Sequence, residues 1–177
     1  VGVICTHMHP DHIGQARMIT EQFQCPLYMT RGEYYQARTF ANGSSDSHSS
    51  WIGQQFYKRA GMPADYLEQI SKMWSQRASE GMSMPTLPGG YERLVDGQVL
   101  RIGDNDWRVV VGSGHSPEHA CLYSSALKVL ISGDQILPII TSNVSVHPSE
   151  PNANPMKDWM ESHDRLLEVI PDDTFVL

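Results

Sequence analysis

The 177-residue chain is long enough for one domain with a buried core, and no apolar run in it reaches membrane-spanning length. Its formal net charge of −7 argues against nucleic acid or an anionic membrane as the main partner, so we expect a small-molecule substrate. The cysteines at positions 5, 25 and 121 have no paired spacing, which indicates reduced thiols and a cytoplasmic protein.

The first part of the chain alternates between strand and helix patterns. Short apolar runs at 1–6 and 25–30 predict buried strands, and the apolar spacing at 13–23 and 31–40 predicts helices. Residues 41–50 are small and polar, which is typical of a loop. This order favours a layered α/β fold.

Two further helical patterns follow at 50–61 and 63–81, before Pro and Gly residues break the periodicity. They interrupt a chain that is otherwise rich in strands, so we expect an insertion at about 45–90. We also expect residues 51–84 to form a helical cover beside the functional site, because such insertions often act as lids.

From Tyr91 onward the pattern changes to short strands separated by turn signals. Four strands are predicted, at 98–102, 106–113, 119–125 and 127–132. After an irregular stretch, an amphipathic helix is predicted at 155–170 and a last strand at 173–177.

The stretch "THMHPDHIG", residues 6–14, holds three histidines and an aspartate within six residues, where the first predicted strand ends. His7 and His9 are two residues apart, so in an extended segment both side chains point the same way and can reach one metal ion. Asp11 and His12 lie where the chain turns into a helix, and they can reach a second, adjacent ion. Two divalent metals are therefore expected; zinc is favoured, with iron and manganese as alternatives.

Two later segments offer further ligands from the ends of predicted strands. "GSGHSPEH", residues 112–119, contains His115 and His119, and "SGDQIL", residues 132–137, contains Asp134. Side chains at the ends of neighbouring strands can converge, and a carboxylate such as Asp134 could bridge two metals.

These three motifs, in this order, resemble the successive metal-binding motifs of the metallo-β-lactamase superfamily of hydrolases, in particular its glyoxalase II-like branch. The resemblance implies an αβ/βα sandwich fold with two metal sites and with a supporting histidine that is not a ligand. It assigns the residues as follows: His7, His9 and His115 to the first metal, Asp11, His12 and a bridging Asp134 to the second, and His119 to support.

The chain departs from that family at both ends. It has almost no strand before the histidine motif, and it lacks the further histidine that the family places after a strand matching 173–177. We therefore expect residues 1–177 to form a partial metallo-β-lactamase domain with an incomplete sandwich. Weak binding of the second metal, little hydrolysis by this segment alone and self-association through open sheet edges would follow.

The function expected from these motifs is that of a metal-dependent hydrolase. A metal-bound hydroxide would attack an ester-like carbonyl, and Asp11 would act as a catalytic residue by orienting that hydroxide. Thioesters and lactones are the favoured substrates, and the negative charge counts against phosphodiesters such as RNA. Two alternatives remain open: a mononuclear iron sulfur dioxygenase of the same fold, and a non-catalytic metal-binding regulatory protein.

Three other histidines have less specific surroundings. His147 follows the Asp134 segment in an irregular stretch and could face a substrate. His163 lies on the apolar side of the last predicted helix, where packing is the simplest interpretation, and His48 lies in the serine-rich loop, where solvent exposure is expected.

Overall fold

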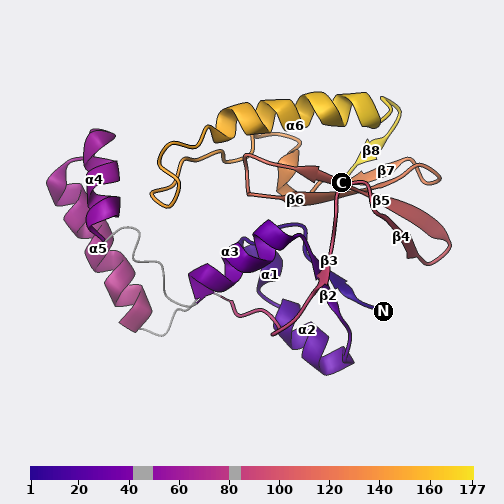
Figure 1. The fold of residues 1–177 in the computed structure, drawn as a ribbon, viewed down its shortest axis with the longest axis horizontal. Helices are drawn as coiled ribbons and strands as arrows, with labels where there is room; N and C mark the ends of the chain where they lie inside the picture. The colour runs from indigo at the N-terminus through magenta and orange to yellow at the C-terminus, as the bar shows by residue number, and fades with distance from the viewer. Residues whose placement is uncertain (42–49, 80–84) are drawn as a thin grey trace.

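Two β-sheets form the centre of the molecule, and helices lie on their outer faces (Figure 1). The computed structural model describes residues 1–41, 50–79 and 85–177. The first sheet is parallel, with its strands in the order β1 (Val3–Ile4), β2 (Leu27–Met29) and β3 (Glu92–Arg93).

The second sheet has five strands in sequential order. Strands β4 to β7 are antiparallel, and β8 pairs in parallel with β7. The bounds are β4 (Val99–Ile102), β5 (Asn105–Gly112), β6 (His119–Ser124), β7 (Val129–Ile131) and β8 (Phe175–Val176).

Helices cover the two sheets from opposite sides (Figure 1). The first sheet carries α1 (Pro10–Ile13), α2 (Ala16–Phe23) and α3 (Arg31–Ala41). The second sheet carries α6 (Pro155–Val169), which packs along it and contacts β5. A short 3₁₀ turn, η2 (Gly133–Gln135), follows β7.

Three buried apolar layers hold this stack together. The alternation of side chains along a strand sends Val109 to the layer between the sheets and Val110 to the layer under α6, where Leu166 is buried. A third layer, with Leu27 and Met29 at its centre, lies between the first sheet and its helices. The order helix–sheet–sheet–helix is the αβ/βα sandwich that the sequence predicted.

The helix predicted at 13–23 is divided into α1 and α2, and α1 begins earlier, at Pro10. Proline suits the first position of a helix, because its fixed φ is helical and its missing N–H would have no intrahelical partner. Asp11 and His12 therefore lie in a helical turn.

Strand β3 was not predicted. Its two residues, Glu92 and Arg93, are charged and exposed, so they show no apolar alternation. The strand exists because its backbone pairs with Tyr28 and Met29 of β2, which is a long-range contact.

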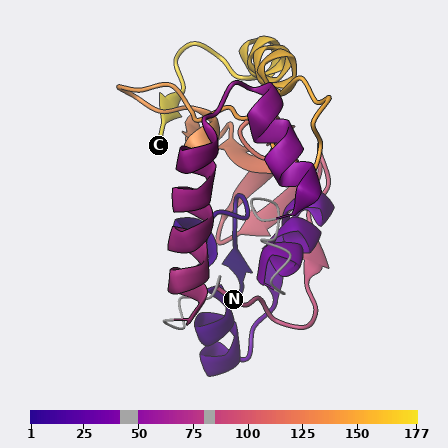
Figure 2. The same ribbon diagram turned by 90° about the vertical axis from the view of Figure 1, so that its left-hand side faces the viewer.

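Two helices stand to one side of the sandwich, α4 (Trp51–Arg59) and α5 (Ala64–Ser79). They pack against each other, and the irregular stretch before α6 extends toward the same side (Figures 1 and 2). Both helices were predicted; that they cover a functional site stays a prediction. Among the described residues, no helix is both long and apolar enough to cross a bilayer.

Candidate metal centre

Residues 7–9 alternate between the protein core and the candidate site. Met8 is buried in the apolar layer beneath α1 to α3, whereas His7 and His9 on either side of it turn their rings toward each other, with centroids 4.7 Å apart. The side chain of His7 is fully buried. Alternation of an extended backbone accounts for this arrangement.

Asp134 lies at the point where the three motifs meet. Its Oδ1 is 3.3 Å from Nε2 of His12, and its Oδ2 is 3.6 Å from Nε2 of His115 and 3.9 Å from Nε2 of His7. The η2 turn after β7 brings this carboxylate beside the loops of the first and second motifs. One carboxylate thus faces ring nitrogens from two separate segments.

The six candidate ligands fall into two groups that share Asp134. In each group, one ligand atom per residue can be chosen such that all of them lie within 4.8 Å of one another. The groups are His7, His9, His115 and Asp134, and Asp11, His12 and Asp134. These are the sets that the resemblance to the metallo-β-lactamase superfamily implied.

The hydrogen bonds of His115 fit a role as a metal ligand. Nδ1 of His115 lies 2.9 Å from the carbonyl oxygen of Asn143, which can only accept, so Nδ1 carries the proton. In the neutral ring Nε2 is then a bare acceptor, and it faces Nε2 of His7 at 3.2 Å. Nitrogen lone pairs and a carboxylate converging on one point are the donor set that divalent metals take.

Burial keeps the central rings neutral. Desolvation, and then the neighbouring rings of His119, His12, His9 and His115, lower the pKa of His7 far below its usual range. Desolvation and His115 also lower the pKa of His9. Neutral imidazole is the form that binds metals.

His119 lies behind the cluster. Its buried ring stacks on that of His7 with centroids 4.7 Å apart, and its Nε2 accepts a hydrogen bond from the backbone N–H of Asp134 at 3.2 Å. Burial lowers the pKa of His119 to about 3. The residue is outside both ligand groups, and it connects two of the segments that carry them.

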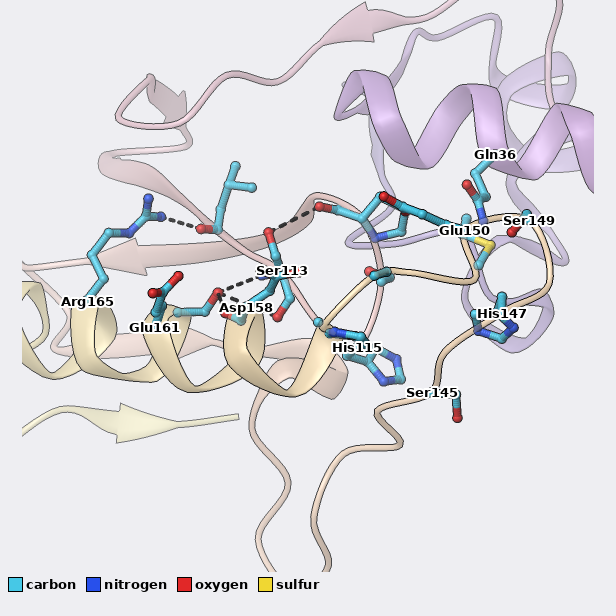
Figure 3. Close-up of a pocket in the computed structure, with 18 residues that line it drawn as sticks. Gln36, Ser113, His115, Ser145, His147, Ser149, Glu150, Asp158, Glu161 and Arg165 are labelled. Atoms are coloured by element: carbon cyan, nitrogen blue, oxygen red, sulfur yellow. Dashed lines mark hydrogen bonds between the residues drawn. The ribbon is translucent and has the colours of Figure 1, made fainter. Parts of the chain in front are cut away.

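Two hollows adjoin His115. The first, of about 510 Å³, is mostly polar and extends from His115 and His147 along the start of α6 to Arg165 (Figure 3). The second, of about 530 Å³, has both His115 and Asp134 in its wall together with apolar side chains: Leu137, Ile140, Val144, Met156 and Trp159. His147, which was predicted to face a substrate, is thus an exposed residue in the wall of the first hollow.

The remaining histidines are elsewhere. Nδ1 of His163 lies 2.8 Å from the carbonyl oxygen of Trp159, and its ring packs on the Trp159 ring, in keeping with a packing role. His48 lies outside the described residues.

Sequence reasoning missed one buried acid beside the site, Glu33 of α3, which is fully buried. Its side chain accepts hydrogen bonds from the backbone N–H groups of Met8 and Glu118, at 2.9 and 2.8 Å. The available signal was its position: Glu33 falls on the same helical face as the buried Ala37, four residues later.

The fold and the cluster of His and Asp ligand atoms are those of a domain that can bind metal, and comparison with known families identifies it. The model of the metallo-beta-lactamase superfamily matches residues 1–177, so the chain belongs to this superfamily.

All three cysteines are free, with Cys5 and Cys121 buried.

Several known proteins are similar to the chain. An uncharacterized protein of Aquifex aeolicus is 27% identical over 177 residues, and the chain covers 66% of it. The acyl-coenzyme A thioesterase MBLAC2 of Bos taurus is 26% identical over 134 residues, which are 75% of this chain and 40% of that protein. The chain thus spans less than two thirds of the length of these relatives.

Solved structures show the same fold. A beta-lactamase domain protein from Burkholderia ambifaria has a TM-score of 0.78 and 38% identity, over all of this chain and 49% of that one. TTHA1623, solved in a di-iron-bound form, has a TM-score of 0.62 and 22% identity, over 99% of this chain and 67% of that one.

Proposed function

We propose that this chain carries the metal centre of a hydrolase that cleaves an ester-like bond, with thioesters or lactones as substrates. The observation that carries the proposal is the pair of ligand groups joined by Asp134. Membership of a superfamily of metallo-hydrolases supports it.

In this proposal His7, His9, His115 and Asp134 would hold one divalent metal, and Asp11, His12 and Asp134 would hold a second. Zinc is the metal we propose, since imidazole and carboxylate are its usual ligands at catalytic sites; the di-iron form of TTHA1623 makes iron the alternative. Metals bound there would supply a water of lowered pKa and a Lewis acid for a carbonyl oxygen.

Asp11 is the residue we propose to orient the reacting water. Its side chain is 77% exposed, and its Oδ2 lies 3.5 Å from Nε2 of His12. An exposed carboxylate oxygen at the rim of the cluster can accept a hydrogen bond from an approaching water and fix its direction.

The two hollows support a substrate with one apolar and one polar part. An acyl group would fit against Leu137, Val144 and Trp159, next to Asp134, while a polar leaving group would lie in the hollow that contains His147. The similarity to a bovine acyl-coenzyme A thioesterase supports this choice.

The test uses the protein at its full natural length. We expect elemental analysis to find a divalent metal, and a screen of thioesters, lactones, carboxylic esters and phosphodiesters to give turnover on one of the first two classes. Asp134→Asn should lower metal affinity and kcat/KM by at least about 100-fold, more than is usual for loss of a residue that only supports a ligand. His163→Gln, a histidine change outside both groups, is the matched control.

Two outcomes would overturn the proposal. Full metal occupancy without turnover on the whole panel would indicate a binding or regulatory protein. A single iron per chain, with oxygen consumption on a persulfide substrate, would indicate a sulfur dioxygenase.

A further inference from the structure

Glu33 connects the two loops that carry the candidate ligands. Its Oε2 accepts from the backbone N–H of Met8, which lies between His7 and His9, at 2.9 Å. Its Oε1 accepts from the backbone N–H of Glu118, in the loop that begins at His115, at 2.8 Å. We call Glu33 with these two N–H groups the Glu33 bridge.

A fully buried carboxylate requires a physical reason. Moving a carboxylate out of water is costly unless hydrogen bonds compensate, and bonds from N–H groups to a charged acceptor are stronger than neutral ones. Both oxygens of Glu33 have such a bond, and the residue is 0% exposed. An apolar residue at this position of α3 would avoid the cost, but it would leave two buried N–H groups without their partner.

A second set of bonds ties the same segment to the same loop. The hydroxyl of Thr30 donates to the carbonyl oxygen of Glu118 at 2.7 Å, and the backbone N–H of Gly32 donates to the Glu118 carboxylate at 2.8 Å. The contact is close, since a Cβ at Gly32 would lie 3.1 Å from Cγ of Glu118 and the Glu118 side chain would have to move by a few tenths of an ångström. Residues at the junction of β2 and α3 therefore bind both the backbone N–H and the carbonyl oxygen of Glu118.

The two loops belong to different halves of the sandwich. The Met8 loop follows β1 of the first sheet, and the Glu118 loop precedes β6 of the second sheet. A ligand group with residues from both loops, such as His7 and His115, forms only if the distance between the loops stays constant. Among the described residues, one backbone–backbone hydrogen bond also joins these segments. The N–H of Ala120 donates to the carbonyl oxygen of Thr6 at 2.8 Å.

We propose that Glu33 is a positioning residue for the metal centre: its carboxylate sets the distance between the His7–His9 loop and the His115 loop before any metal binds. The inference rests on the proposed function, and it adds to it a residue that touches neither metal nor substrate.

The test compares Glu33→Gln with wild type in the full-length protein. A glutamine offers one acceptor oxygen and puts an NH₂ donor opposite the other N–H, so one of the two bonds is lost. We expect zinc affinity, measured by competition with a chelator, to fall about 10- to 100-fold. We also expect amide hydrogen exchange in the metal-free protein to accelerate more at Met8 and Glu118 than at other core amides.

The matched control is Glu21→Gln on α2, which removes the same charge from an exposed pair with Arg17. Its zinc affinity should stay within about twofold of wild type, since exposed ion pairs contribute little. If Glu33→Gln does not fold, Thr30→Val decides, because it removes only the bond to the Glu118 carbonyl oxygen. For that variant we expect a loss of roughly 3- to 10-fold in zinc affinity.

Failure of this inference and failure of the proposed function give different results. If the folded variants bind zinc as tightly as wild type does, the role of Glu33 is overturned and the metal centre is not. The same holds if amide hydrogen exchange at Met8 and Glu118 is unaltered. Absence of zinc binding by the wild-type protein would overturn the metal centre itself, and the positioning role with it.

Discussion

Gly133 occupies a position beside Asp134 that a larger residue could not take without moving His119. Its φ of +50° is in the left-handed region, and a Cβ there would lie 2.7 Å from Cε1 and 2.8 Å from Nε2 of the His119 ring. The ring cannot retreat freely, because it is buried and packed on His7. The position before the candidate bridging carboxylate is thus restricted both in its backbone conformation and in the volume of its side chain.

We expect Gly133→Ala to lower the free energy of unfolding by about 2–4 kcal/mol, from left-handed strain and overpacking together. Zinc affinity should fall with it, since the η2 turn carries Asp134. The control is Gly103→Ala, which has a similar φ of +59° but nothing within 4 Å of the added Cβ. This control should lower the free energy of unfolding by about 1 kcal/mol and leave zinc affinity unchanged. Urea unfolding and chelator competition measure both; equal effects of the two variants would contradict this account.

The charge of Glu33 makes stability depend on pH. Burial, with a smaller contribution from the nearby Glu118 carboxylate, raises the pKa of Glu33 from 4.5 to about 6, although the Ser116 hydroxyl and the N–H groups of Glu118 and Met8 oppose the rise. The folded protein therefore binds this proton more tightly than the unfolded chain does. The contribution of Glu33 to stability is highest below pH 4.5 and declines as the pH rises to about 6.

A difference measurement isolates this effect. The free energy of unfolding of wild type minus that of Glu33→Gln should decrease by about 2 kcal/mol from well below pH 4.5 to well above pH 6, since each pKa unit corresponds to 1.36 kcal/mol. Chelator in the buffer removes any contribution from metals, and all other titratable groups are common to the two proteins, so their contributions cancel in the difference. A difference that stays constant across this range would show that the Glu33 carboxyl is not perturbed by burial.

At the scale of elements, α4 and α5 pack on each other at one side of the sandwich, toward which the stretch before α6 also extends (Figures 1 and 2). Trp51 of α4 is 75% exposed, which is unusual for a side chain of this size. A substrate-binding cover, the role predicted for this helical pair, would use such exposed aromatic surface.

We expect Trp51→Ser to raise KM by about 3- to 10-fold, because an exposed aromatic side chain contributes roughly 1 kcal/mol where it contacts a ligand. Unfolding and zinc affinity should stay as in wild type. Replacing residues 50–79 by a short Gly–Ser linker should change the ranking of substrates more than metal affinity. Steady-state kinetics on the substrates found in the screen measure both. Loss of zinc with unchanged selectivity would rule out the role of a cover.

At the scale of the whole molecule, the candidate ligands connect the two sheets. His7, His9, Asp11 and His12 follow β1 of the first sheet, whereas His115 and Asp134 lie next to β6 and β7 of the second. A metal held by both sets binds the folded state and finds no such site in the unfolded chain, so it stabilises folding.

Zinc at 100 times its dissociation constant should add about 2.7 kcal/mol to the free energy of unfolding. For a domain of this size that corresponds to a rise in Tm of roughly 5–10 °C. Thermal unfolding with zinc and with chelator measures it in the full-length protein. Asp134→Asn, which removes a charge from both ligand groups, should show much less of this rise; an equal rise in that variant would place the metal elsewhere.

The sequence alone was sufficient for the parts of the molecule whose signal is local. The short run at 106–113, bounded by turn signals, predicted β5, and the two-residue spacing of His7 and His9 in an extended segment predicted that they would face one point. Strand and helix periods are visible in a short window of residues, because they follow from backbone geometry. The motif order carried the superfamily and its sandwich fold.

Other features were decided only by tertiary structure, because the partners that determine them are far away in the chain. Glu33 is buried through bonds to residues 25 and 85 positions away, and its place on the buried face of α3 does not reveal those partners. β3 forms because β2 offers its free edge, and the proton of His115 is fixed by Asn143, 28 residues later. A carboxylate, a two-residue strand and a ring tautomer have no sequence period, so their state depends on which groups the fold brings within hydrogen-bonding distance.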